Sequence, residues 1–369
     1  MKIIRISVFR LALPLQRPYE LQGGRLRFEQ LDSTLVRLDT DDGVSGWGEA
    51  CPWRSTYLPA FPKGIRAGLE ELAPGLLGRD PRRTDVINTM MDTALPGHPY
   101  VKSAIDIACW DILGKATGLP VCDLLGGRRP EDVTIQSSIP SDDPPEMWRT
   151  IERYHARGYR IHSAKVGSDV AADIERIEYL AERMPAGSSL TIDANRAWIP
   201  DQAIRVMQAT ETVDAYFEQP CETYEECLQV RRSTRQPILL DEIIHTYEDL
   251  VRAYHDQACE GIGLKPNRVG GLTKARRIRD FCVQMGLRLN IEDTGGTALA
   301  DTAAVHLAQA TPARYRRGTW FCHEMITVDP IIGGARNLGG VARAPRTPGL
   351  GAEPDPEALG DPLMVVGYE

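Results

Sequence analysis

Five charged residues each follow a short apolar run in the middle of the chain, and they recur every 23 to 28 residues. Lysines follow the outer two runs, as Lys165 and Lys265. Carboxylates follow the three runs between them, as Asp193, Glu218 and Asp241. Each run has the length of a buried strand, and the regular spacing predicts successive parallel strands of a barrel. The five charged groups would then lie together at one rim.

Three carboxylates at one rim would offer a metal ion oxygen ligands only. Mg²⁺ prefers such hard donors, with Mn²⁺ as the alternative ion. Zinc is disfavoured because neither histidine nor cysteine stands at these positions. We therefore predict that Asp193, Glu218 and Asp241 bind Mg²⁺.

The two lysines are suited to moving protons at a bound carbon atom. A lysine is normally protonated, with a pKa of about 10.4. Burial and a nearby divalent cation both disfavour the charged form, so that a lysine can become a general base. A divalent metal on the substrate carboxylate would stabilise the enediolate that forms when the α-proton leaves. The pattern therefore predicts Mg²⁺-dependent α-proton abstraction, with Lys165 and Lys265 acting from opposite faces.

The segment that carries these residues, 128–326, alternates apolar runs with stretches of helical periodicity. This alternation is typical of parallel strands joined by right-handed helical crossovers. The expected strands are 133–136, 160–165, 189–193, 215–218, 237–241, 261–265, 287–293 and 316–320. We therefore predict an α/β fold with a modified TIM barrel as its catalytic domain.

Residues 1–127 predict a separate α+β domain. Its expected strands and helices are strands 2–12, 33–39 and 44–49 and helices 64–76, 83–95 and 101–117. Two loops rich in glycine, proline and aromatic residues, 17–24 and 51–63, are candidate lids or ordinary surface connections. Residues 327–369 are rich in glycine and proline, and we expect them to return to this domain rather than to add a barrel unit.

Composition excludes several classes of partner. The 369 residues carry a net charge of −8 without a basic stripe, which argues against nucleic acid. No apolar run approaches the roughly 18 residues of a membrane span, and the N-terminus lacks the features of a secretory signal. We therefore expect a cytoplasmic protein. The eight cysteines are scattered without a Cys-x-x-Cys pair, which predicts buried free thiols.

With these residues the chain resembles the enolase superfamily, in its muconate-lactonizing subgroup. The likeness covers nearly the whole chain and includes Gly46-Trp47-Gly48-Glu49, residues 104–111 and Val269-Gly270-Gly271-Leu272 besides the five rim residues. It implies a (β/α)7β barrel under an N-terminal α+β capping domain. It also implies the same three Mg²⁺ ligands, the same two catalytic lysines and a homo-oligomer, either a dimer or an octamer.

One position departs from the subgroup, whose second barrel strand often ends in Lys-x-Lys. Here Ser163 takes the place of the first lysine, so that the surroundings of Lys165 differ. We expect Ser163 and Asn195 to contact the catalytic and metal-binding side chains rather than the substrate. Glu292 and Asp293 stand where the mandelate-racemase subgroup would have a histidine, which favours the two-lysine mechanism.

Three residues outside the central stretch are candidates for substrate binding. Asp293 ends the seventh expected strand, where it can face a substrate cation, and Trp320 on the eighth strand offers a ring face to a cationic nitrogen. Tyr57 lies in the second candidate lid. Packing is the alternative role for Trp320 and Tyr57. Dipeptide epimerases of the subgroup that the chain resembles use an Asp-x-Asp motif for the substrate ammonium, and its absence near Trp320 argues against a dipeptide substrate.

Within the subgroup, the chain resembles the proline-derivative branch, and most of all the cis-3-hydroxy-L-proline dehydratases. Residues 55–59, 96–100 and 271–275 carry this likeness. It implies dehydration of a hydroxyproline-type amino acid, a small carboxylate with a cationic nitrogen. The alternatives are 2-epimerisation of proline betaine or hydroxyproline betaine, muconate cycloisomerisation or o-succinylbenzoate synthesis, and a non-catalytic binding protein on the same fold.

Overall fold

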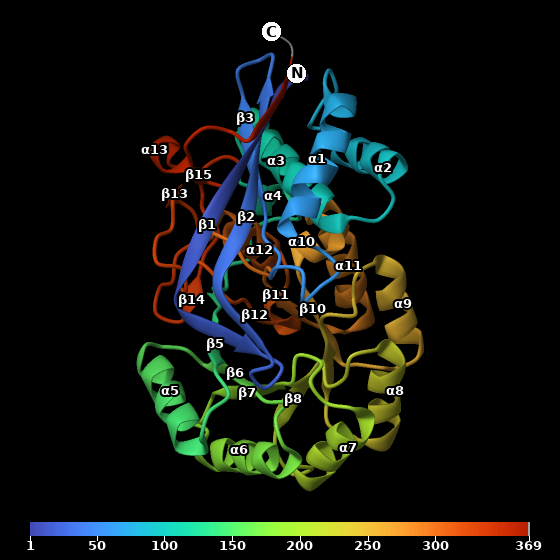
Figure 1. Cartoon of the computed structure of the whole chain (residues 1–369), viewed down its shortest axis with the longest axis vertical. Helices are drawn as coiled ribbons and strands as arrows, with labels where there is room; N and C mark the ends of the chain where they lie inside the picture. Colours follow the sequence, from blue (N-terminus) through green and yellow to red (C-terminus); the bar gives the residue numbers. More distant parts are fainter. Residues whose placement is uncertain (368–369) are drawn as a thin grey trace.

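A four-stranded antiparallel sheet forms the outer layer of the cap (Figure 1). The computed structural model describes residues 1–367. The sheet has the order β16-β1-β2-β3 and consists of β1 (Ile3–Leu21), β2 (Leu26–Thr40), β3 (Ser45–Ala50) and β16 (Met364–Gly367). The predicted loop 17–24 is largely wrong, because β1 continues to Leu21 and pairs with the start of β2. The glycine and proline content of this stretch reflects a register shift and a tight turn within one long hairpin.

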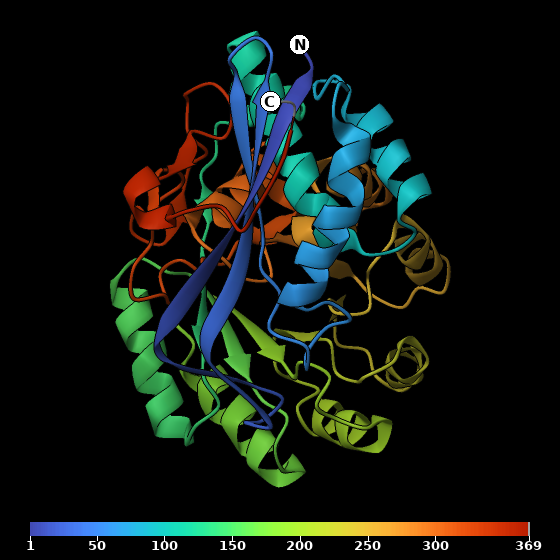
Figure 2. The ribbon, with the colours of Figure 1, turned by 45° about the horizontal axis from the view of Figure 1, so that its top comes forward.

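The tip of this hairpin lies against the rim of the barrel (Figure 2). Gly23 has a φ of +61°, and a Cβ atom there would lie 2.4 Å from the carbonyl oxygen of Gly167. Arg25 donates a hydrogen bond of 2.7 Å to the carbonyl oxygen of Ala197. The first candidate lid is therefore held over the barrel by β structure.

Helices complete the cap, and α3 (Pro99–Thr117) lies between the sheet and the barrel. The others are α1 (Pro62–Leu76), α2 (Thr84–Ala94) and α4 (Val121–Leu124). Most of α3 is buried on all sides, because it lies between the cap sheet and the barrel. Gly48 permits the close approach of β3, since a Cβ atom there would lie 1.9 Å from the carbonyl oxygen of Ala104.

The barrel has eight parallel strands in sequence order, which confirms the predicted fold class. They are β5 (Gln136–Ile139), β6 (Ile161–Lys165), β7 (Ser189–Asp193), β8 (Ala215–Glu218), β9 (Ile238–Leu240), β10 (Gly261–Leu264), β11 (Arg288–Ile291) and β12 (Arg316–Gly318). A parallel bridge between Ile135 and Thr319 joins the first and last strands. The predicted first strand, 133–136, is split, because β4 (Val133–Thr134) pairs outside the barrel with β14 (Val341–Ala342).

Helices follow most of the barrel strands, as the alternation predicts (Figure 1). They are α5 (Pro144–Ala156), α6 (Val170–Arg183), α7 (Pro200–Ala209), α8 (Tyr224–Ser233), α9 (Tyr247–His255), α10 (Pro266–Val269), α11 (Leu272–Met285), α12 (Ala298–Gln309) and the 3₁₀ turn Ala313–Tyr315. The short α10 was not expected from the sequence. No helix within residues 1–367 has the length and hydrophobicity to cross a membrane.

The last segment leaves the barrel and passes back along the cap. It contains β13 (Ile331–Gly333), β14, β15 (Ala352–Pro354), α13 (Pro356–Leu359) and β16. β13 pairs with β15, and β16 pairs antiparallel with β1 at the edge of the cap sheet. The domain limits at 127 and 326 remain predictions.

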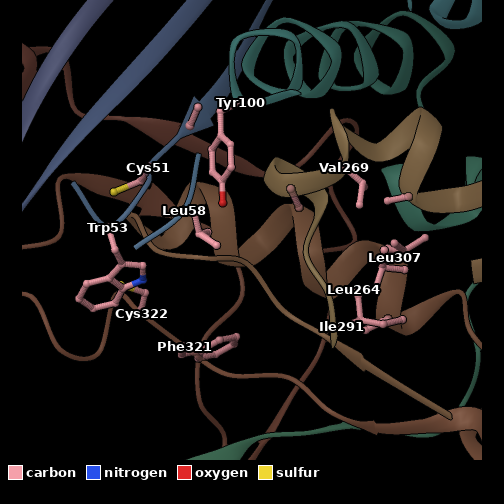
Figure 3. Close-up of a cluster of buried hydrophobic side chains, with 14 of the residues drawn as sticks. Cys51, Trp53, Leu58, Tyr100, Leu264, Val269, Ile291, Leu307, Phe321 and Cys322 are labelled. Atoms are coloured by element: carbon pink, nitrogen blue, oxygen red, sulfur yellow. The ribbon is translucent and has the colours of Figure 1, made fainter. Parts of the chain in front are cut away.

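Apolar side chains join the second candidate lid to the barrel. Figure 3 shows Cys51, Trp53 and Leu58 from this loop near Phe321 and Cys322 of the segment after β12. These side chains belong to one buried hydrophobic cluster. All eight cysteines are buried and free, as the sequence predicts.

Two buried carboxylates of the cap bind the N-termini of barrel helices. Glu49, at the end of β3, accepts hydrogen bonds from the backbone amides of Thr297 (2.9 Å) and Ala300 (3.1 Å), where α12 begins. Asp106 on α3 accepts from the Thr273 amide (2.9 Å), where α11 begins. Burial raises the pKa of Glu49 to about 7 and that of Asp106 to about 6. These contacts fix the cap on the barrel.

We expect the Glu49→Ala substitution to lower the free energy of unfolding by about 3 kcal/mol, because it leaves buried amide and hydroxyl donors without an acceptor. Urea denaturation followed by circular dichroism measures the effect. Glu29→Ala, which removes a carboxylate that is 72% exposed on the same sheet, should change the value by less than about 0.5 kcal/mol. Equal stabilities of the two variants would contradict the anchoring role of Glu49.

Candidate active site

The barrel brings all five charged residues of the central stretch to its C-terminal rim. Lys165, Asp193 and Glu218 are the last residues of β6, β7 and β8. Asp241 and Lys265 are the first residues after β9 and β10. Lys165 stands beside Asp193 across the sheet, and Asp193 beside Glu218. Parallel strands therefore place these groups next to one another, as their spacing predicts.

Each lysine is paired with a carboxylate at this rim. Lys165 donates a hydrogen bond to Asp193, and the Lys265 ammonium lies 2.8 Å from Asp241 Oδ2. Burial by itself would lower the pKa of Lys165, but the charge of Asp193 raises it well above the ordinary lysine value. The pKa of Lys265 is raised in the same way by Asp241. Each ion pair therefore favours the ammonium form of its lysine.

The second oxygen of Asp241 is bound by Arg268, which reaches it from α10. The Arg268 Nη1 atom lies 2.8 Å from Asp241 Oδ1, and the guanidinium is 1% exposed. Burial would raise the pKa of Asp241, but Arg268 and Lys265 lower it below its usual range. Arg268 was not predicted from the sequence, because α10 is too short to show a periodic pattern.

Glu218 has a buried carboxylate oxygen that a divalent cation would satisfy. Its Oε2 atom is buried and has no hydrogen-bond partner within residues 1–367. Burial, and then the negative charges of Asp193 and Asp241, raise the pKa of Glu218 well above its ordinary value. The positive charge of Mg²⁺ would offset the repulsion between three carboxylates, and their oxygens are ligands that this ion prefers. In the described chain no three acidic, histidine or cysteine side chains converge as a ready-made cage. Asp193 and Asp241 are instead paired with the two lysines.

Tyr57 closes the second cap loop over the rim. Its hydroxyl donates to Glu242, and the Nδ2 atom of Asn195 lies 3.3 Å from the Tyr57 oxygen and 3.2 Å from Glu242 Oε1. The Arg196 guanidinium lies 5.0 Å from the centre of the Tyr57 ring and donates to the Tyr57 carbonyl. Burial and the charge of Glu242 raise the pKa of Tyr57 well above its ordinary value. Tyr57 therefore acts here as a phenol that ties the loop to the barrel.

The backbone after β7 is adapted to this contact. Asn195 has a φ of +45° and Arg196 a φ of +69°, a left-handed conformation that is uncommon outside glycine. Such strain persists where surrounding contacts hold it, and it is common at functional sites. Here it turns both side chains toward Tyr57.

We expect Tyr57→Phe to open the loop 51–61 more often without unfolding the protein. The substitution removes one hydrogen bond, worth about 1 to 1.5 kcal/mol, and so raises amide hydrogen exchange in this loop about 10-fold. Mass spectrometry of exchanged peptides measures this. Tyr247→Phe, on a ring that is 41% exposed, should leave the exchange of this loop unchanged. An unaltered rate in Tyr57→Phe would show that the hydroxyl does not hold the loop.

Aromatic rings form one wall of the cavity between cap and barrel. Tyr19 stacks on Trp53 with ring centres 5.0 Å apart, and its centre lies 6.0 Å from that of Trp320. The Tyr19 hydroxyl lies 2.8 Å from the hydroxyl of Ser138 on β5. All four residues line the cavity. Trp320 was predicted from the sequence, whereas Tyr19 and Trp53 were missed, although both occur in the aromatic-rich stretches singled out as lids.

Asp293 lies at the cavity, but its carboxylate is directed to the backbone. It accepts hydrogen bonds from the amides of Thr294 (2.7 Å) and Asn267 (3.3 Å), and it is fully buried. Burial raises the pKa of Asp293 to about 7. The preceding residue, Glu292, lies 3.3 Å from Lys265 and was not assigned a role from the sequence. Ser163 lines the cavity on β6, as part of the surroundings of Lys165.

Two family models match the chain in succession. The mandelate racemase / muconate lactonizing enzyme N-terminal domain matches residues 4–126, and the enolase C-terminal domain-like family matches residues 146–358. A member of the enolase superfamily from Roseovarius nubinhibens, solved as a complex with magnesium, is 52% identical and superposes with a TM-score of 0.96, covering 100% of both chains.

Named enzymes are similar to the chain over almost its whole length. A cis-3-hydroxy-L-proline dehydratase from Roseibium aggregatum is 43% identical, covering 98% of this chain and 99% of the relative. An L-Ala-D/L-Glu epimerase from Bacillus subtilis is 29% identical, covering 95% and 96%. With matching family models on both parts of the chain, the protein belongs to the enolase superfamily, as an enzyme of its mandelate racemase and muconate lactonizing group.

Proposed function

We propose that this enzyme removes the α-proton of a small amino-acid carboxylate and dehydrates cis-3-hydroxy-L-proline. The observation that carries the proposal is the placement of Lys165 and Lys265, on the second and sixth barrel strands, on either side of three carboxylates. The 43% identity to a dehydratase of this substrate supports the choice of reaction. Asp193, Glu218 and Asp241 are the groups that would hold Mg²⁺. When bound, Mg²⁺ supplies positive charge beside the substrate carboxylate and makes the α-proton more acidic.

The geometry of the substrate matches two groups on opposite sides of the cavity. In cis-3-hydroxy-L-proline the hydroxyl and the carboxylate share one ring face, so that the α-proton lies on the other. One lysine takes this proton, and the electron pair of the C–H bond passes into the enediolate. As the C3–O bond breaks, these electrons form the C2=C3 double bond. The hydroxyl leaves as water with a proton from the opposite side, where the other lysine lies.

Recognition of the substrate nitrogen is assigned to the aromatic wall. Trp320 and Tyr19 present ring faces to the cavity, and a ring face attracts a cationic nitrogen. Tyr57 closes the cavity from the cap, and Asp293 is part of the cavity lining. Lys165 and Lys265 are then free to act on the α-carbon.

The second candidate is 2-epimerisation of a proline betaine or hydroxyproline betaine. The stacked rings of Tyr19 and Trp53 beside Trp320 favour it, because a quaternary ammonium group is bound by aromatic surfaces. The first step is the same in both reactions. Epimerisation then needs only the return of a proton on the opposite face.

The two reactions are separated by incubating the enzyme with Mg²⁺ and a panel of proline derivatives in D₂O, followed by NMR. Loss of water from cis-3-hydroxy-L-proline with a rate above that of the metal-free protein is the expected result. Deuteration of the α-carbon with inversion, without loss of water, would identify an epimerase instead. Absence of α-exchange in every member of the panel would reject this substrate class.

A further inference from the structure

Glu292 divides its carboxylate between a catalytic lysine and a fixed amide. Its Oε1 atom lies 3.3 Å from the Lys265 ammonium, and its Oε2 atom accepts a hydrogen bond of 2.7 Å from Gln136. Gln136 begins β5, the first barrel strand, and Glu292 follows β11, the seventh, so that the contact joins two strands that are not neighbours in the sheet. The amide of Asn290 supports Gln136 at 3.4 Å. Glu292 is only 5% exposed, and this chain of contacts restricts its position.

The two lysines differ in their acidic partners. Within the described residues, Asp193 is the acidic group paired with Lys165, whereas Lys265 is paired with both Asp241 and Glu292. Asp193 and Asp241 are the proposed Mg²⁺ ligands, and a cation that they bind competes with the lysines for their oxygens. Glu292 is not in that set. It is therefore the carboxylate that stays beside Lys265 when the metal ligands are engaged.

The neighbouring acid does not share this arrangement. Asp293 directs its carboxylate to the amides of Thr294 and Asn267, away from the lysines. Glu292 instead lines the cavity together with Lys265 and Gln136. Two adjacent acids at one strand end therefore have different partners, and only Glu292 contacts a proton-transferring group.

We propose that Glu292 is the positioning residue of Lys265, clamped by Gln136 so that the lysine stays over one face of the substrate. Proton transfer on the Lys265 face depends on Glu292, and proton transfer on the Lys165 face does not. This inference rests on the proposed function, since it assigns a role within the same two-lysine site. The lysines on the two faces of the cavity would then be positioned by different residues.

The faces are tested separately with the two enantiomers of a proline-type substrate, because a base on one side reaches the α-proton of one enantiomer only. Exchange of each α-proton is followed by NMR in D₂O with saturating Mg²⁺, and Lys165→Ala and Lys265→Ala identify which enantiomer depends on which lysine. Glu292→Gln should slow the Lys265-dependent exchange about 10²-fold, the usual cost of a misplaced catalytic group, and change the other less than 2-fold. Gln136→Leu should act on the same enantiomer.

Glu225→Gln, at an exposed carboxylate on α8, is the control, since it makes the same charge change outside the cavity. It should leave the ratio of the two exchange rates as in the wild type. Equal slowing of both enantiomers by Glu292→Gln would overturn the proposal, because it would place Glu292 in substrate or metal binding. Unchanged exchange rates for both enantiomers would overturn it as well.

A second measurement needs no substrate. Acetylation of the two lysines by acetic anhydride, read by mass spectrometry on the Mg²⁺-loaded protein, should increase severalfold at Lys265 in Glu292→Gln and stay constant at Lys165. Equal labelling of Lys265 in wild type and variant would overturn the positioning role. Should the wild type exchange neither enantiomer, the proposed function fails, and the labelling alone then decides for or against Glu292.

Discussion

Lys165→Ala is expected to lower kcat/KM for dehydration by about 10³-fold, within the range that a positioned acid–base group contributes. Lys165 is 9% exposed and lies at the cavity with its ammonium group toward Asp193. Water admitted by the alanine would be a weaker base and would lack its fixed direction. Steady-state kinetics at saturating Mg²⁺ measures the loss, and Lys265→Ala should produce a loss of similar size.

The control for this result is Lys63→Ala, on the exposed start of α1. It should retain the wild-type kcat/KM. Calorimetry with Mg²⁺ should show that Lys165→Ala still binds the metal, because the three carboxylates remain. Turnover that survives the loss of either lysine would refute the two-lysine mechanism.

Glu218→Gln is expected to weaken Mg²⁺ binding at least 10²-fold and to stabilise the metal-free protein. A glutamine keeps one oxygen donor but removes the charge that a divalent cation needs. In the absence of metal, the same change removes the repulsion between Glu218 and the carboxylates of Asp193 and Asp241, which we expect to raise the free energy of unfolding by about 1 kcal/mol. Calorimetric titration and thermal unfolding with and without Mg²⁺ measure the two effects.

The stability of the metal-free wild type should also depend on pH through Glu218. Its pKa is raised in the folded state by burial and by its acidic neighbours. The folded protein therefore binds this proton more tightly than the unfolded chain does, and the resulting stability is complete below the ordinary pKa of 4.5. It is lost as the pH rises through the folded-state pKa. Glu218→Gln should show a smaller dependence of the same sign, because Glu49, Asp106 and Asp293 also have raised pKa values.

Glu225→Gln, at a carboxylate 69% exposed on α8, provides the control for the Glu218 variant. It should change neither the Mg²⁺ affinity nor the stability of the metal-free protein beyond about 0.5 kcal/mol. A Glu218→Gln protein that binds Mg²⁺ like the wild type would remove Glu218 from the ligand set.

Features that depend on short stretches of chain could be predicted from the sequence. An apolar run followed by a charge determines both a buried strand and the charged group at its end. Repetition of that unit with helices between the strands determines a parallel barrel, whose strand ends share one rim. Lys165, Asp193 and Glu218 therefore lie where the spacing places them. The long hairpin was harder to predict, because Pro14, Pro18 and the glycines of its tip resemble a loop in composition.

Contacts between distant residues were decided by the tertiary structure. Tyr57 meets Glu242 across 185 positions, and Gln136 meets Glu292 across 156. In neither pair does the local sequence around one residue indicate the other. The two residues of each pair approach only when the barrel closes and the cap packs against it. The five charged groups and their common rim thus follow from the sequence alone. Which carboxylate holds which lysine, and which phenol closes the loop, follows only from the packing of cap on barrel.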